Sequence, residues 1–126
     1  MISSPFPPQI LIVEDEVIIA MEIEIRLESA GYLVCGLVTT GEEAVSAARE
    51  KSPDLILMDI TLHGTMNGLD AAARIQAEKS IPVIFLSASV SDDILRRIRE
   101  FRTGQYISKP FDETDLLSSV RRVLGR

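Results

Sequence analysis

Carboxylate, hydroxyl and ammonium side chains follow short apolar runs at separate places along the chain. The carboxylates are the group Glu14, Asp15 and Glu16 and the single Asp59, the hydroxyl is Ser87, and the ammonium is Lys109. Carboxylates that lie close together repel one another, so either one is protonated or a cation lies between them. Mg²⁺, or Mn²⁺ in its place, suits such a group because it takes hard oxygen ligands. Lysine and hydroxyl groups can bind phosphoryl oxygens, so the set predicts a phosphoryl-transfer site.

Asp59 is the best candidate for the group that accepts phosphate. It stands alone at the end of its apolar run, and the loop after it can leave its carboxylate accessible. Carboxylates are known to form covalent aspartyl phosphates. Glu14 and Asp15 are better placed to hold the metal. Each of these residue types is also common in solvated surfaces and turns, so the prediction depends on their joint placement.

Five short apolar runs predict the strands that position these residues. The runs are Ile10–Val13, Leu33–Val38, Leu55–Met58, Val83–Leu86 and Gln105–Ser108. Uninterrupted apolar runs of this length suit strands that are buried on both faces, as in a parallel sheet. Ligands of an open parallel sheet bind outside the carboxyl ends of its strands, which is where the acids, the serine and the lysine stand.

The segments between the runs predict helices. Thr40 and Glu43 have the spacing of a capping box, and Ser91 and Asp112 can cap two later helices. The first such segment fits two structures, because Met21–Glu28 alternates apolar and polar residues as a strand does. We predict a helix there, since the segment is long and must carry the chain back across the sheet. Five strands that alternate with helices give a doubly wound α/β fold.

The composition bounds the class of protein. The chain has 126 residues, which suggests one domain, and its formal net charge of -6 argues against nucleic acid or anionic membrane as the main partner. Its single cysteine, Cys35, lies in an apolar stretch and is expected to be a small core residue. No stretch approaches the ~18 apolar residues of a membrane span, and the N-terminus lacks the pattern of a signal peptide. We therefore expect a cytoplasmic protein with a proline-rich tail over residues 1–8 and one domain over residues 9–126.

The chain resembles bacterial two-component response-regulator receiver domains of the chemotaxis-regulator type over residues 9–126. The matching motifs are ILIVEDE (10–16), LILMDI (55–60), VIFLSA (83–88) and YISKPF (106–111). The resemblance implies a flavodoxin-like fold, with five parallel strands in the order 2-1-3-4-5 and five helices.

The resemblance also implies a role for each matching residue of the metal site. Asp59 would be the phosphoacceptor and would also touch the metal. Asp15 would bind Mg²⁺ directly, and Glu14 would act through water. The backbone carbonyl of Thr61 would be a further ligand.

Three more residues match the part of the family that responds to phosphorylation. Lys109 would bind the phosphoryl group, with a cis bond before Pro110. Ser87 and Tyr106 would be the switch residues. The phosphodonor would be a sensor histidine kinase or a histidine phosphotransfer protein. The face made by the fourth helix, fifth strand and fifth helix would contact a downstream protein or a second copy of the chain, and the domain itself would not be an enzyme.

The chain departs from the family pattern in the loop after Asp59. The family often has proline four residues after the phosphoacceptor, whereas this chain has His63, and the loop LHGTMNG (62–68) is one residue longer than the commonest version. We expect His63, the only histidine, to be a solvent-exposed loop residue.

Two other classes of protein remain as alternatives. A magnesium phosphatase with an aspartyl phosphate usually has a second acid two residues after the nucleophile, where this chain has Thr61. A binding module could be an FMN carrier or a pseudo-receiver that works without phosphorylation. FMN binding needs a hydroxyl-rich loop where this chain has Glu14–Glu16, and a pseudo-receiver normally lacks one of the site residues, all of which this chain has.

Overall fold

Strands and helices alternate along the chain in the computed structural model, which describes residues 6–125. The strands are β1 (Gln9–Val13), β2 (Leu33–Val38), β3 (Leu55–Asp59), β4 (Val83–Ser87) and β5 (Gln105–Ser108). The helices are α1 (Val17–Ser29), α2 (Gly41–Lys51), α3 (Gly68–Glu78), α4 (Asp92–Arg99) and α5 (Glu113–Leu124). Residues 1–5 of the predicted tail and Arg126 lie outside the described residues.

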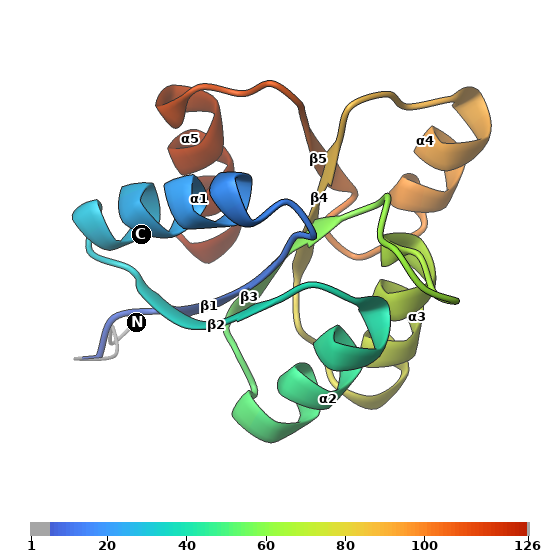
Figure 1. The fold of residues 1–126 in the computed structure, drawn as a ribbon, viewed down its shortest axis with the longest axis horizontal. Helices are drawn as coiled ribbons and strands as arrows, with labels where there is room; N and C mark the ends of the chain where they lie inside the picture. Colours follow the sequence, from blue (N-terminus) through green and yellow to red (C-terminus); the bar gives the residue numbers. More distant parts are fainter. Residues whose placement is uncertain (1–5, 126) are drawn as a thin grey trace.

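All five strands pair in parallel and form one sheet in the order β2-β1-β3-β4-β5. Helices α1 and α5 cover one face of this sheet, and α2 and α3 cover the other (Figure 1). The predicted fold class and strand order are confirmed. From β1 the chain adds β2 on one side of the sheet and β3, β4 and β5 on the other. Such a change of direction places a crevice for ligands at the carboxyl ends of β1 and β3.

Each central strand contributes side chains to both faces of the sheet. Along β1, Ile10 and Ile12 pack with apolar residues of α1 and α5, whereas Leu11 and Val13 pack with residues of α2 and α3. Successive side chains of a strand point to opposite faces, so an uninterrupted apolar run fills two cores at once. Each fully buried side chain of this size contributes about 1.5–3 kcal/mol of burial free energy. This packing holds the strands in place, and with them the strand ends that carry the site.

The prediction that all five runs are buried on both faces is wrong for β2 and β5. In β2, Leu33 and Leu37 are 44% and 42% exposed, and Tyr106 of β5 is 38% exposed. These strands lie at the two edges of the sheet formed by residues 6–125, so each pairs with one neighbouring strand there instead of two. Cys35 of β2 is half-buried and packs against the core beside α2.

The predicted helix starts are confirmed by their capping hydrogen bonds. Thr40, Ser91 and Asp112 each accept from a backbone N–H three residues ahead: Glu43 at 3.1 Å, Ile94 at 3.2 Å and Asp115 at 2.8 Å. Such caps stabilise a helix by about 1 kcal/mol each. None of the helices within residues 6–125 combines the length and the apolar character that a membrane span requires.

The ambiguous first segment is the helix α1, as predicted. Its buried residues, Ala20, Ile23 and Leu27, recur every three or four positions and face the sheet. Met21 and Ile25, which complete the strand-like alternation, are 51% and 62% exposed. The alternating pattern therefore came from apolar residues on the solvent side of a helix.

Candidate functional site

The carboxyl ends of β1 and β3 bring the acids together. These strands are neighbours, with Val13 paired to Met58, so that Glu14 and Asp59 follow side by side. Glu14 and Asp59 are buried, with exposed fractions of 1% and 4%. The low exposure of Asp59 differs from the accessible carboxylate that the sequence suggested, because Lys109 and the backbone N–H of Thr61 contact its two carboxylate oxygens.

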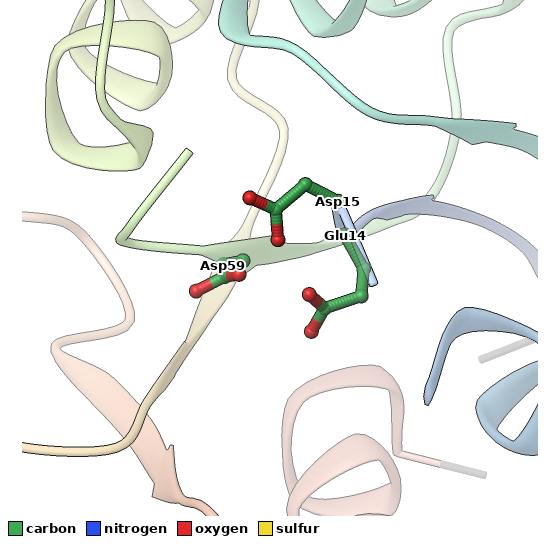
Figure 2. A group of neighbouring side chains, drawn as sticks. All are labelled: Glu14, Asp15 and Asp59. Atoms are coloured by element: carbon green, nitrogen blue, oxygen red, sulfur yellow. The ribbon is translucent and has the colours of Figure 1, made fainter. Parts of the chain in front are cut away.

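Three carboxylates converge at this point (Figure 2). Glu14, Asp15 and Asp59 each offer one oxygen, and these oxygens lie within 4.8 Å of one another. Figure 2 shows Asp15 on one side of the group and Glu14 on the other, with Asp59 completing it from β3. Hard oxygen ligands at this spacing suit a small divalent cation such as Mg²⁺, so the residues present fit the metal that the sequence predicted.

Lys109 reaches into the same group from the end of β5. Its Nζ lies 2.5 Å from Oε1 of Glu14 and 3.3 Å from Oδ2 of Asp59. The backbone N–H of Lys109 donates to the carbonyl of Ser87 at 2.8 Å, and the bond to Pro110 is cis. The lysine is thus held by the backbone of β4 with its ammonium group toward the carboxylates.

Burial and the neighbouring charges shift the pKa values of these groups. Burial raises the pKa of Glu14 to about 7, against the lowering effect of the Lys109 ammonium. Burial also raises the pKa of Asp59, although hydrogen bonds from its neighbours and the charge of Lys109 oppose this. The pKa of Lys109 is raised, because burial lowers it by less than Glu14 and Asp59 raise it. Three carboxylates beside one lysine leave an excess of negative charge that a divalent cation would neutralise.

The free energy of unfolding of the metal-free protein is expected to fall as the pH rises from about 5 to about 8. The pKa of Glu14 is about 7 in the folded protein against an ordinary 4.5, so the folded state binds more protons across this window. The stabilisation from the protonated Glu14 is complete at pH values below 4.5 and is lost as the pH rises past about 7. The free energy of unfolding should fall by up to about 3 kcal/mol over this range.

Urea unfolding at a series of pH values in the presence of a chelator measures this slope. Glu14→Gln removes the titrating group, so its stability should depend less on pH than that of the wild type. Equal slopes for the two proteins would show that Glu14 does not carry the effect.

The two predicted switch residues lie on β4 and β5, the strands that follow β3 in the sheet. The Ser87 hydroxyl donates to the backbone carbonyl of Ser89 at 2.6 Å. Tyr106 pairs with Phe85 across β4 and β5, and its side chain is partly exposed. Thr61 donates its backbone N–H to Oδ1 of Asp59 at 3.1 Å, which places it beside the group.

The sequence did not identify two residues as neighbours of the site, His63 and Gly68. His63 is exposed, as expected, yet its Nδ1 lies 2.6 Å from Oδ2 of Asp15. The sequence feature that pointed to His63 was its position four residues after Asp59, where the family often has proline. Gly68 begins α3 so close to β3 that a Cβ there would overlap the backbone oxygen of Asp59, and its N–H donates to the carbonyl of Ile60 at 2.8 Å.

The sequence profile of the response regulator receiver domain matches residues 10–121 of the chain. PdtaR, a transcriptional regulatory protein of Mycobacterium tuberculosis, is 33% identical over 120 residues, which are 95% of this chain and 58% of PdtaR. The chain spans little more than half the length of the curated relatives that it matches.

Two solved structures show the same fold with related sequences. The signal receiver domain of a modulated diguanylate cyclase from Desulfovibrio desulfuricans is 36% identical, with a TM-score of 0.86 and 94% of both chains covered. The receiver domain of a sensor histidine kinase from Pseudomonas aeruginosa is 32% identical, with a TM-score of 0.83, and covers 95% of this chain and 99% of that one. The latter was solved with a magnesium ion coordinated in its active site cleft.

Proposed function

The chain belongs to the response regulator receiver domain family, and from this premise we propose that Asp59 accepts a phosphoryl group from a phosphohistidine. The observation that carries the proposal is the environment of Asp59. Its carboxylate lies with those of Glu14 and Asp15 within 4.8 Å, and the ammonium of Lys109 lies 3.3 Å from its Oδ2. A carboxylate, a lysine and a cation site in contact are the parts that phosphoryl transfer to an aspartate requires.

In the proposed step an oxygen of Asp59 attacks the phosphorus in line with the phosphorus–nitrogen bond of the donor. The new oxygen–phosphorus bond forms as the phosphorus–nitrogen bond breaks, and the bonding pair returns to the imidazole nitrogen. Lys109 neutralises charge on the transferred group, and the N–H of Thr61 orients Asp59 by donating to its Oδ1.

Asp15 and Asp59 would hold Mg²⁺ directly, with Mn²⁺ as a substitute, and the backbone carbonyl of Thr61 would be a further ligand. Glu14 would act through water. Bound Mg²⁺ would supply positive charge beside the phosphoryl oxygens. The magnesium ion in the cleft of the similar Pseudomonas receiver domain supports this assignment.

Ser87 and Tyr106 would convert phosphorylation into a change of surface. The hydroxyl of Ser87, which donates to Ser89, would turn to the phosphoryl group, and Tyr106 would move into the space that it leaves. The face of α4, β5 and α5 would then change its packing. Such a change is a population shift driven by contacts to the phosphoryl group.

The proposed partners follow from the same chemistry. The donor would be a sensor histidine kinase or a histidine phosphotransfer protein, and the face of α4, β5 and α5 would bind a downstream protein or a second copy of the chain. The net charge of -6 makes direct binding to nucleic acid or anionic membrane unfavourable. We place the domain, residues 9–126, in the cytoplasm as a phosphoacceptor without catalytic turnover of its own.

Incubation of the purified chain with acetyl phosphate and Mg²⁺ tests the proposal. Intact-protein mass spectrometry should show one added phosphoryl group, and a chelator should suppress it because the excess negative charge of the site would then repel the donor. Peptide mapping should place the group between Leu55 and Thr61. Failure to form the adduct with Mg²⁺ present, or equal yields with and without the metal, would count against the proposal.

A further inference from the structure

His63 makes a contact that neither the sequence pattern nor the phosphorylation chemistry requires. Its Nδ1 lies 2.6 Å from Oδ2 of Asp15, so the imidazole and the carboxylate are in direct polar contact. The side chain of Asp15 is 12% exposed, whereas that of His63 is 90% exposed. The histidine therefore approaches the acidic group from its solvent side.

The backbone around His63 is fixed although its side chain is exposed. Residue 63 forms a parallel bridge with Thr40, at the start of α2. Two residues further on, the hydroxyl of Thr65 donates to Oε1 of Glu42 at 3.1 Å. The loop is thus attached to α2 at two points on either side of Gly64. Because the backbone is held, the imidazole loses less conformational entropy when it contacts Asp15.

Asp15 depends on such a contact more than its neighbours do. Lys109 contacts Glu14 and Asp59, while the side chain of Asp15 is in contact with the imidazole of His63. Repulsion from two buried carboxylates favours turning Asp15 away into solvent. The polar contact with His63 opposes that movement.

His63 itself stays outside the group of ligand atoms. Within residues 6–125 the atoms that lie within 4.8 Å of one another come from Glu14, Asp15 and Asp59. The imidazole touches the group through Asp15 alone. This geometry is that of a residue that orients a metal ligand rather than of a ligand.

We propose that His63 is a positioning residue that holds Asp15 in place for the divalent cation. The proposal rests on the proposed function, since it concerns the same cation site. Removing a residue that contacts and orients a metal ligand changes metal affinity by about 10–100-fold. Because the contact is at the surface, we expect the lower end of this range.

Isothermal titration calorimetry of the purified chain with Mg²⁺, and separately with Mn²⁺, tests the role of His63. His63→Leu removes the polar contact at similar size and should weaken the binding of both ions by about tenfold. His63→Asn places a polar amide close to the position of Nδ1 and should restore most of the affinity. Thr65→Val is the matched control, since it removes one attachment of the same loop and leaves Asp15, His63 and the bridge to Thr40 in place, so it should weaken binding by much less than His63→Leu does.

The outcomes separate this inference from the proposed function. A wild-type chain that binds neither ion would overturn the cation site and with it the role of His63. Binding by the wild type that His63→Leu leaves unchanged would overturn the role of His63 alone. Weakening of the same size in Thr65→Val would also overturn it, because the loop and not the imidazole would then be responsible. A loss of affinity confined to Mn²⁺ would overturn it too, because the imidazole would then be a direct ligand.

Discussion

Replacement of Asp59 by asparagine is expected to reduce phosphoryl uptake from acetyl phosphate below detection while the domain stays folded. An amide nitrogen or oxygen cannot form the acyl phosphate, and Lys109 keeps only Glu14 as a charged partner of the two. The pKa of Asp59 is raised by burial, so its ionised form is unfavourable in the metal-free fold. Asp59→Asn should therefore be at least as stable as the wild type, because the amide carries no charge for burial to oppose.

Intact-protein mass spectrometry and urea unfolding measure the two halves of this prediction. Asp93→Asn is the control, because Asp93 is exposed on α4 and pairs with Arg96 at 3.0 Å, away from the site. It should take up phosphate as the wild type does. An undiminished adduct on Asp59→Asn would identify another phosphoacceptor, and the proposed role of Asp59 would have to be abandoned.

Gly68→Ala is expected to cost about 3 kcal/mol or more of unfolding free energy. The added Cβ would overlap the backbone oxygen of Asp59 and would lie 2.9 Å from the carbonyl carbon of Asp59 and from Cα of Ile60. These are backbone atoms of the last residue of β3 and of the residue after it, and they cannot move aside as a side chain can. Overpacking against adaptable neighbours costs about 1–3 kcal/mol, so a backbone clash should reach the upper end of this range or exceed it.

The expected loss of stability in Gly68→Ala is opposite to the gain that helix propensity alone would give, so the experiment separates the two effects. Alanine is favoured over glycine in helices by up to about 1 kcal/mol. Gly36→Ala is the matched control, since its added Cβ would meet Cδ1 of Leu11 at 3.1 Å, the end of a flexible side chain. The midpoint of urea unfolding should fall much further for Gly68→Ala than for Gly36→Ala. A stable Gly68→Ala variant would show that α3 can retreat from β3 at little cost.

The substitution at Gly68 should also impair phosphoryl uptake by the molecules that remain folded. The clash is with Asp59 itself, so any relief moves either the phosphoacceptor or the loop that carries His63. Uptake per folded molecule, measured well below the unfolding transition, should be lower in Gly68→Ala than in Gly36→Ala. Equal uptake would mean that α3 alone had moved.

Local sequence patterns were sufficient to predict the strands and most helix starts. The apolar runs that end at Asp59 and Ser87 became β3 and β4, because uninterrupted apolar residues fit a strand with a core on each face. Capping residues marked helix starts because their side chains satisfy backbone N–H groups within four residues. Both effects depend on neighbours in the sequence.

Periodicity alone could not decide two features of the fold. The residues of α1 fit a strand as well as a helix, and burial of Ile23 and Leu27 against the sheet is what distinguishes them. The run of β2 predicted a strand buried on both faces, but its place at the sheet edge leaves Leu33 and Leu37 exposed. Exposure depends on which strands become neighbours, and this is a property of the whole topology.

The sequence by itself determined the kinds of residue at the site and the fold that gathers them, because strand ends in a parallel sheet share one edge. Only the tertiary structure decided that Lys109 contacts Glu14 as well as Asp59, that His63 reaches Asp15, and that Gly68 touches the backbone of Asp59. The reason is physical: these contacts join segments that are far apart along the chain or folded back across a loop. Their distances follow from side-chain direction and strand register, which no local pattern encodes.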